Sequence, residues 1–560
     1  EFAVDPVFGI QVEATILPPM FSVPTAEVAD AMVDKYRNYG RAVEQLTDRY
    51  LEGVASGRVP PGFAVDGVIA QLDEWLALPV EEDPLLNTRV PEDFTEDQAA
   101  AHRSALAEVV RHVVRPAVER QRTVLRDEVR PVARPEGQEG LQWLPGGDLV
   151  YDRSIHRYTT LPMQAGEIHE IGLQQIARLA EEYRAIGAEA LGTTDLQEIF
   201  SRLRDDPALH HTTGEGVRAA AETAFDKARA EMGDWFGRLP EADCVVEETA
   251  SGAQAFYFPP AEDGSRPGMF FMNTADPTSW GTFEVEATAY HEGIPGHHLQ
   301  LAIAQELGDA VPAFRRNAYI VAYGEGWGLY TERLSDEMGL YGSPLDRMGM
   351  LSADSMRAGR LVVDTGIHAK GWSRQQVLDY MYANAAVRPT RAVAEAERYM
   401  AIPGQALAYK IGQLKILALR ASAEAALGDD FDVRAFHDAL LGAGALPLDL
   451  LQRRMDAWIT DQLAGREQLD VEAAARGQFH RVGKVLCDVI KQQPFGPRHD
   501  HFPLDGLGRR FELYPFSDFA ALIHTKFLSL GSISGTKCQS HCHTNCKYAC
   551  YKLSHWFSSR

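Results

Sequence analysis

The chain has 560 residues, a formal net charge of −24, a pI near 5.2 and a hydrophobic fraction of 45%. That fraction is enough for a sizeable core, and the acidic balance disfavours nucleic-acid phosphates and anionic membranes as partners, because both select basic faces. No apolar run reaches the roughly 18 residues of a membrane span and no charged-then-apolar signal pattern is seen, so we expect a cytoplasmic location, with a removed signal peptide left open because the first residue is Glu1.

Apolar residues recur at helical spacing along most of the chain, on both sides of the segment 251–274. We expect amphipathic helices over 26–58, 94–129, 164–190 and 215–237, and again from 282 to about 465, including 392–400, 407–427 and 447–463. The sequence therefore predicts a mainly α protein.

The segment 251–274 has a different character. Ala253–Phe258 and Met269–Met272 are short apolar runs, separated by a Pro-Pro and Asp-Gly turn, and they predict two antiparallel strands joined by a loop. This is the one β element that we expect.

Residues 290–300 hold three imidazoles and a carboxylate within eight positions, in the order Tyr-His-Glu-Gly-Ile-Pro-Gly-His-His-Leu-Gln. Histidine is a common zinc ligand, and a glutamate next to it can act as general base, as in the His-Glu-x-x-His motif of metalloproteases. The spacing differs from that motif, because the residue four after His291 is Pro295 and the next histidines, His297 and His298, come six and seven later. In a regular helix two turns rise roughly 10.5 Å, too far to share one ion.

A deformation of the helix between these histidines would remove the difficulty. Pro295 lacks an N–H and clashes with the carbonyl four residues back, while Gly293 and Gly296 tolerate unusual backbone angles. We therefore expect a bulged or looped turn at 293–296.

These motifs carry a family resemblance. His-Glu-x-x-Pro-Gly-His-His-x-Gln followed by Gly-Glu-Gly-Trp-x-Leu-Tyr resembles the bacterial proteins grouped as domain of unknown function 885. The resemblance covers roughly residues 28–465 and includes four further segments: Gly53–Pro60, Glu167–Leu173, Arg266–Pro277 and Arg398–Gly412.

That family looks like a distant relative of helical zinc peptidases such as the Taq-type carboxypeptidase, thimet-type oligopeptidases and angiotensin-converting enzyme, which carry His-Glu-x-Gly-His. The resemblance implies that His291 and His297 are zinc ligands, with His298 as the competitor of His297. It also implies a third ligand from a following helix, and Glu325, 34 residues after His291, fits.

Three glycines surround this glutamate, at positions 324, 326 and 328. Each costs about 1 kcal/mol relative to alanine inside a helix, so their clustering indicates a backbone that closely approaches something else. A glycine-lined helix crossing is the alternative explanation.

Catalytic roles follow from the same comparison. Glu292 would act as general base toward water on the metal. For the developing oxyanion, the expected donor is Tyr409, with His368 as second choice, since relatives use a tyrosine or a histidine. A Tyr or His that is hydrogen-bonded within a helical core is the alternative for both.

Substrate contacts are expected from two segments. Tyr399 and Lys410 flank Pro403-Gly404 together with Tyr409, and Arg398 could pair with a peptide's terminal carboxylate, although a plain salt bridge would explain it as well. In zinc peptidases of this kind a strand beside the metal helix adds the substrate as an extra strand, which makes Asn273 a candidate contact. The alternative for Asn273 is a turn-capping role.

The last 60 residues differ from the rest. Four cysteines recur there at i, i+4 spacing: Cys538, Cys542, Cys546 and Cys550. Two histidines, His541 and His543, lie between them. A small metal or disulfide cluster is one explanation, but zinc modules usually pair cysteines two to four apart across a longer stretch. We expect an appended segment unrelated to catalysis.

The resulting hypothesis is a zincin-like, mainly α metallohydrolase with a small antiparallel sheet, in which two helical halves surround a central groove. Its domains would be an extension over 1–25, the hydrolase over 26–465 and a Cys-rich tail over 466–560. The expected cofactor is Zn²⁺, and the expected substrate is a short peptide, with cleavage from its C-terminus as the preferred mode, by a monomer or homodimer. The alternatives are an inactive peptide- or metal-binding protein and an amide hydrolase of small metabolites.

Overall fold

A computed structural model describes residues 4–465 except 8, 22 and 251. One compact unit runs from Glu1 to Leu469 and contains every element described below. The Cys-rich tail, and with it the prediction made for its cysteines and histidines, lies outside the described residues.

The N-terminal helices form a core of their own, made of apolar side chains between Val4 and Val129. Their starts are set by capping side chains: the Thr25 hydroxyl accepts from Val28 N, and Thr95 and Gln98 form a capping box. Residues before 26 belong to this core, because the Tyr39 hydroxyl donates to the Ile10 carbonyl at 2.9 Å. The helices are α1 (Ile10–Ile16), α2 (Ala26–Ala55), α3 (Gly62–Ala77), α4 (Glu96–Val109) and α5 (Arg115–Val124).

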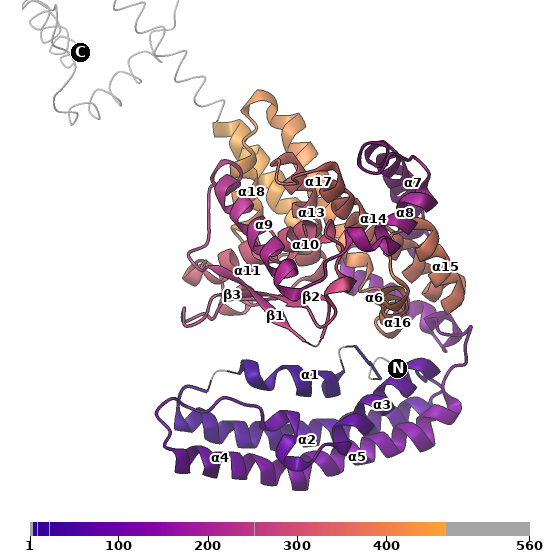
Figure 1. Ribbon diagram of the computed structural model, residues 1–560, viewed down its shortest axis with the longest axis vertical. Coiled ribbons are helices and arrows are strands. Elements are labelled where there is room, and N and C mark those ends of the chain that lie inside the picture. The colour runs from indigo at the N-terminus through magenta and orange to yellow at the C-terminus, as the bar shows by residue number, and fades with distance from the viewer. Residues whose placement is uncertain (1–3, 8, 22, 251, 466–560) are drawn as a thin grey trace, which may run out of the picture. The chain divides into compact units, whose positions relative to one another are not determined.

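A second and larger core runs from Leu141 to Met455. Figure 1 shows its helices gathered around α10 and α13, with a small sheet beside them. Its helices are α6 (Gly147–Thr159), α7 (Ala165–Ala190), α8 (Leu196–Asp205), α9 (Gly214–Trp235), α10 (Glu284–Glu292), α11 (His297–Gln305), α12 (Ala313–Arg316), α13 (Val321–Glu337), α14 (Pro344–Lys370), α15 (Arg374–Asn384), α16 (Pro389–Ala401), α17 (Leu407–Leu427) and α18 (Val433–Leu441), and residues 448–465 are also helical.

The sheet has three strands, β1 (Cys244–Thr249), β2 (Ala255–Phe258) and β3 (Gly268–Asn273), in the order β1-β3-β2. β2 and β3 pair antiparallel as predicted, from Ala255↔Met272 to Phe258↔Met269. β1 was not predicted, and because it pairs parallel with β3 the sheet is mixed rather than antiparallel. Its burial alternates weakly and it is separated from β3 by 18 residues, so no local turn revealed it.

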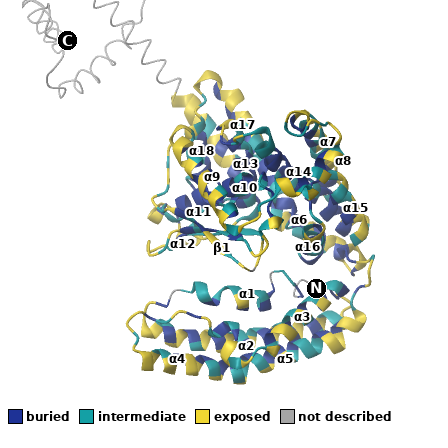
Figure 2. Cartoon of the chain, viewed as in Figure 1, coloured by how far each residue is buried: buried dark blue, intermediate teal, exposed yellow. Residues whose placement is uncertain are grey.

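Helices α13 and α17 cross in backbone contact. A Cβ added to Gly326 would lie 2.5 Å from the Gly412 Cα, and a Cβ on Gly412 would lie 1.9 Å from the Ala322 carbonyl oxygen. Both positions therefore exclude side chains, and α13 is buried along most of its length (Figure 2). The crossing fixes α13 deep in the second core.

The mainly α fold predicted from the sequence is confirmed, and the predicted helices over 26–58, 164–190, 215–237 and 407–427 match α2, α7, α9 and α17 closely. None of the helices among the described residues is long and apolar enough to cross a membrane.

Candidate metal centre

Three side chains from three helices converge in the second core. His291 lies near the end of α10, His297 begins α11 and Glu325 lies in the first turns of α13. Their ligand atoms all lie within 4.8 Å of one another. The histidines are 2% and 7% exposed, and the Glu325 side chain is 12% exposed, so the cluster is shielded from bulk water.

The spacing of these atoms fits a metal ion. The Nε2 atoms of His291 and His297 lie 3.4 and 3.5 Å from Glu325 Oε2. Two ligand atoms that each lie roughly 2.0 to 2.1 Å from a tetrahedral zinc are about 3.3 to 3.4 Å apart. His297 Nδ1 is also buried without a hydrogen-bond partner among the described residues, an arrangement that is unusual for an imidazole held only by protein contacts.

Two residues that the sequence analysis did not single out hold the ligands in place. Glu332 Oε1 lies 2.8 Å from His291 Nδ1, and the Tyr319 hydroxyl donates to Glu325 Oε1 at 2.8 Å. A carboxylate on the far nitrogen of a ligating histidine fixes its tautomer and orientation. Glu332 follows Glu325 by seven residues on the same helix, so helical spacing could have identified it, whereas nothing near Tyr319 in the sequence indicates its contact.

The helix is interrupted between the two histidines. α10 ends at Glu292 and α11 begins at His297, which meets the expectation of a disrupted turn at 293–296. A Cβ on Gly293 would lie 2.1 Å from the Phe225 ring, and one on Gly296 would lie 1.9 Å from the His291 carbonyl oxygen. The turn thus packs too tightly for side chains at either position.

Gly328 makes room for the His291 ring. A Cβ at this position would lie 2.7 Å from the His291 ring, so the ring rests directly on the α13 backbone. Both explanations for the glycines around Glu325 therefore apply: Gly328 makes room for the ring of the candidate ligand His291, and Gly326 allows the close helix crossing.

The carboxylates around the cluster favour a cation. Burial lowers the pKa of His291, but hydrogen bonds with Glu325 and Glu332 outweigh this and raise it to about 9. Burial raises the pKa of Glu325, yet the two histidines hold it well below its usual range. The same field that retains a proton on His291 would stabilise a divalent ion.

Glu292 and Tyr409 border the cluster. Glu292 is half-buried, and its charge acts on His291 and Tyr319. The Tyr409 ring stacks on His291, with centroids 6.4 Å apart and planes at 21°. Burial raises the pKa of Tyr409, and the Glu325 charge raises it further, so its hydroxyl keeps its proton as a donor.

Two predicted histidines lie elsewhere. His298 points away from the cluster, with Nδ1 2.9 Å from the Tyr257 hydroxyl and Nε2 3.0 Å from the Ala242 carbonyl oxygen. His368 is a core residue whose Nδ1 accepts from Leu141 N at 3.2 Å and whose Nε2 donates to the Tyr399 carbonyl at 2.9 Å. Both expectations are corrected, because both nitrogens of each ring are already bonded within the protein.

The three candidates beside Pro403-Gly404 are also structural. Arg398 donates to Gln405 Oε1 at 2.7 Å and to Glu395 Oε2 at 2.9 Å, which is the plain salt-bridge alternative. The Tyr399 hydroxyl accepts from Arg360 and donates to Glu395, and Lys410 is fully buried against Asp354. The Tyr399 hydroxyl, the Lys410 ammonium and the Nη atoms of Arg398 are thus engaged in contacts within the protein.

Asn273 closes a turn at the end of β3. Its amide donates to the Gly252 carbonyl at 3.2 Å and its oxygen accepts from Ala275 N at 3.1 Å. Since β3 is paired on both sides, it cannot take up another strand, so the expected role in substrate binding is corrected for both the residue and its strand.

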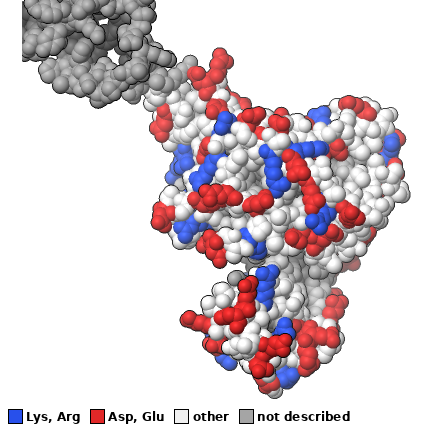
Figure 3. Space-filling view, turned by 60° about the vertical axis from the view of Figure 1, so that its left-hand side comes forward, with Lys and Arg blue, Asp and Glu red and all other residues white. Residues whose placement is uncertain are grey.

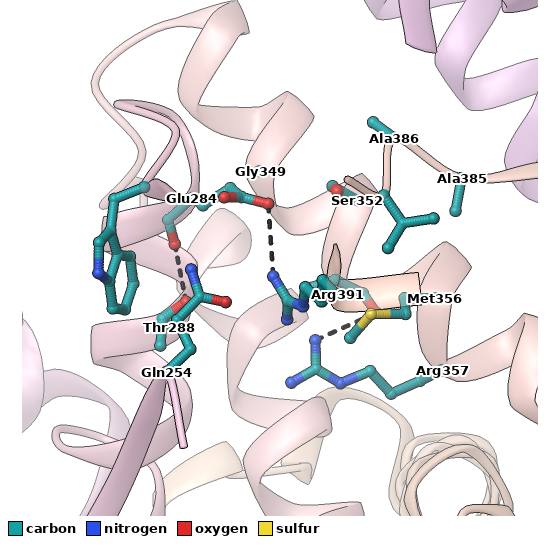
Figure 4. A pocket seen from close by; sticks show the side chains of 13 residues that line it. Gln254, Glu284, Thr288, Gly349, Ser352, Met356, Arg357, Ala385, Ala386 and Arg391 are labelled. Atoms are coloured by element: carbon teal, nitrogen blue, oxygen red, sulfur yellow. Dashed lines mark hydrogen bonds and ion pairs between the residues drawn. The ribbon is translucent and has the colours of Figure 1, made fainter. Parts of the chain in front are cut away.

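The site forms within one half of the protein. The ligands, Glu332 and Tyr409 come from helices of the second core and Tyr319 comes from the connection just before α13, whereas a groove between two halves was expected. A small cavity, open to solvent, lies beside α10, walled by α10, α14 and the segment from Ala385 to Arg391 (Figure 4). It begins on the face of α10 that carries Glu284, Thr288 and, one turn further, Glu292.

Fold and cluster together define a mainly α protein with a buried His-His-Glu candidate metal site. The chain belongs to the family described as bacterial protein of unknown function (DUF885), whose pattern matches residues 4–455. No curated protein sequence matches the chain.

Two solved structures are similar to it. The first, "the putative lipoprotein from Colwellia psychrerythraea", has 30% sequence identity and a TM-score of 0.77, over 82% of this chain and 81% of that one. The second, "a putative lipoprotein of unknown function from Shewanella oneidensis", has 15% identity and a TM-score of 0.53, over 78% and 93% of the two chains, and shows similarity of fold alone.

Proposed function

We propose that this protein is a zinc-dependent hydrolase of short peptides. The observation that supports this best is the convergence of His291, His297 and Glu325, with two of the three ligand pairs at 3.4 and 3.5 Å and Glu332 behind His291. A zincin-like ligand set with a glutamate directly after the first histidine is what peptide hydrolysis through a metal requires.

Zinc bound at the three ligands would lower the pKa of a coordinated water toward ~7 and polarise the scissile carbonyl. Glu292 is placed next to His291 to accept a proton from the attacking water and to deliver it to the leaving amine. Tyr409, which keeps its proton, would donate a hydrogen bond to the carbonyl oxygen as negative charge develops there. Glu332 holds the His291 ring still throughout.

The substrate backbone would lie along β2 rather than β3. β2 is an edge strand that packs against α10, so its outer side can pair with an extended peptide close to Glu292. Acidic and basic side chains are interspersed on the face in Figure 3, with no continuous basic surface there, which supports a peptide rather than a nucleic acid as partner.

Location is a separate proposal. The cytoplasm is the expectation from the sequence, whereas the similar structure from Colwellia psychrerythraea, at 30% identity, is described as a putative lipoprotein, which favours a lipid-anchored protein. Fractionation of cells that produce the full-length gene product decides between them: recovery in the membrane fraction, released by detergent, would overturn the cytoplasmic proposal.

The test combines metal analysis with peptide hydrolysis. Wild type purified without added zinc should carry about one zinc per chain by elemental analysis, and His291→Ala, His297→Ala and Glu325→Ala should lose it. His298→Ala is the matched control, since it removes a neighbouring buried histidine whose nitrogens bond elsewhere, and it should retain the metal.

Activity is measured on a library of short peptides. Glu292→Gln should keep its zinc and lose at least about 100-fold in kcat, the lower range for a general base. Wild type that takes up no metal even when zinc is offered would overturn the proposal. Zinc-loaded wild type that cleaves no peptide would leave the alternative, a metal- or peptide-binding protein.

A further inference from the structure

The cavity beside α10 has a charged lining (Figure 4). Arg357 from α14 and Arg391 from α16 direct their guanidinium groups into it, and Glu284 from α10 is the one carboxylate among the residues that line it. The rest of the lining is neutral and partly apolar, including Trp280 and Gln254. The lining therefore carries two positive charges against one negative charge.

Arg357 connects the lining of the cavity to the candidate metal centre. Arg357 Nη2 lies 3.8 Å from Glu332 Oε1, the atom that also bonds His291, and the Arg357 guanidinium lies 5.9 Å from the centroid of the Tyr409 ring. On the other wall Thr288 and Glu292 are four residues apart on α10, one turn of the same face. A peptide bound at Glu292 would place its next residue in this cavity.

The guanidinium of Arg357 has unused hydrogen-bonding capacity. Its side chain is 14% exposed, its Nε is buried without a partner in the part of the chain that the structure describes, and its carboxylate neighbour at 3.8 Å is too distant for a hydrogen bond. Its Nη1 donates only to the Ala353 carbonyl, at 3.3 Å. By contrast, Arg333 on α13 makes three bonds of 2.6 to 2.9 Å to carboxylates.

Arg391 is held just as loosely. Its Nη1 lies 3.8 Å from Glu284 Oε1, and its side chain is 36% exposed. A shielded guanidinium fork with free donors is suited to bind a carboxylate by two parallel hydrogen bonds.

We propose that this cavity binds a carboxylate of the peptide substrate, with Arg357 as its main contact and Arg391 as the second. The inference rests on the proposed function for the position of the scissile bond. The carboxylate belongs either to the C-terminus of the peptide or to an acidic side chain, and the two sources are separated by the probes below.

Binding is measured in a Glu292→Gln background, so that turnover does not consume the probes. A dansyl-labelled Ala-Ala-Ala-Leu peptide is compared as free acid and as C-terminal amide, and an amidated Ala-Ala-Asp-Leu peptide is compared with its Asn counterpart. The carboxylate form of at least one pair should bind about tenfold more tightly, the size of a charge-assisted hydrogen bond at a partly exposed site.

Arg357→Gln and Arg391→Gln should each reduce this preference, and the Arg357→Lys variant should retain part of it. Glu284→Gln should increase it, because it removes the competing negative charge, a gain that loss of structure would not produce. Arg218→Gln, on the exposed face of α9 and paired only with Glu222, is the matched control and should change nothing. Metal content and thermal unfolding verify that each variant is intact.

Equal affinity for the acid and the amide, together with equal affinity for the Asp and the Asn peptide, would overturn the inference. So would a preference that survives both arginine substitutions. The proposed function is judged separately, with Glu292 intact: peptide hydrolysis without carboxylate preference overturns only this inference, and carboxylate preference without hydrolysis overturns only the proposed function.

Discussion

Two regions of the second core bury charge in opposite ways. In one, Lys410 donates to Asp354 and Gln413, and Arg333 donates to Asp354 at 2.9 and 2.7 Å, so every charge is paired. In the other, the Nε2 atoms of His291 and His297 lie at the long limit of hydrogen bonding, 3.4 and 3.5 Å from Glu325 Oε2, and His297 Nδ1 has no partner among the described residues. Since unpaired buried polar atoms are costly, incomplete pairing distinguishes a site for a ligand from a structural network.

The largest effect is expected from breaking the paired network. Lys410→Met leaves the fully buried Asp354 with Arg333 at 2.7 Å and the more distant Arg178 at 3.8 Å, and loss of one partner of a buried ion pair costs about 3 kcal/mol or more in the free energy of unfolding. Urea unfolding of wild type and variant measures this. Zinc content should stay the same, and loss of zinc in this variant would show that the two regions are not independent.

Asp364 differs from both regions, because it is a buried carboxyl whose hydrogen-bond donors, Tyr151 and Gly404, are neutral. Burial raises the pKa of Asp364 to about 7 although these bonds lower it. The folded protein thus holds a proton that the unfolded chain, with an aspartate pKa near 3.9, releases earlier. The stability from this proton is complete below about pH 4 and is lost as the pH rises through about 7.

Asp364→Asn imitates the neutral carboxyl and should remove this dependence. Between pH 5 and 8 the difference in unfolding free energy between wild type and variant should change by about 2 to 3 kcal/mol. Wild type should become less stable relative to the variant as the pH rises. Thermal or urea unfolding at several pH values measures it. A constant difference across this range would contradict a neutral Asp364 in the folded protein.

The smallest effect concerns the support of the metal cluster. Glu332→Gln keeps the size of the side chain but removes the charge that orients His291, and such losses weaken metal binding by about 10- to 100-fold. Competition with a chelator of known zinc affinity measures the change. Glu337→Gln, at the exposed end of the same helix, is the control and should bind zinc like wild type.

Helical periodicity predicted most of the fold, because long amphipathic segments such as α2 and α7 can be recognised from the spacing of their apolar residues. The three-strand sheet was only partly predicted. β2 and β3 are neighbours in the chain, joined by the loop 259–267, but β1 joins them through a parallel, non-local pairing that no local pattern encodes.

For the candidate site, the residue types and the break at Pro295 led to the correct segments, whereas the roles of single residues depended on packing. His297 and His298 are adjacent in sequence, and only the start of α11 decides which of them faces Glu325. Arg398 and Arg357 both lie near Tyr409, yet Arg398 donates to Glu395 and Gln405, whereas the carboxylate neighbour of Arg357, Glu332, lies 3.8 Å away. Such partners come from distant parts of the chain and cannot be derived from spacing.

Glu325, Gly328 and Glu332 share one face of α13, at steps of three and four residues: a ligand, the place where the His291 ring rests, and the carboxylate that orients it. A single inserted residue between 325 and 332 would turn one part of this set by about 100° relative to the other and disable the whole arrangement at once. The connection 306–318 carries no such constraint on its length, because helix docking and the hydrogen bond from Tyr319 to Glu325, rather than chain length, position the start of α13. Insertions and deletions among relatives should therefore be found in 306–318 and be absent from 319–332.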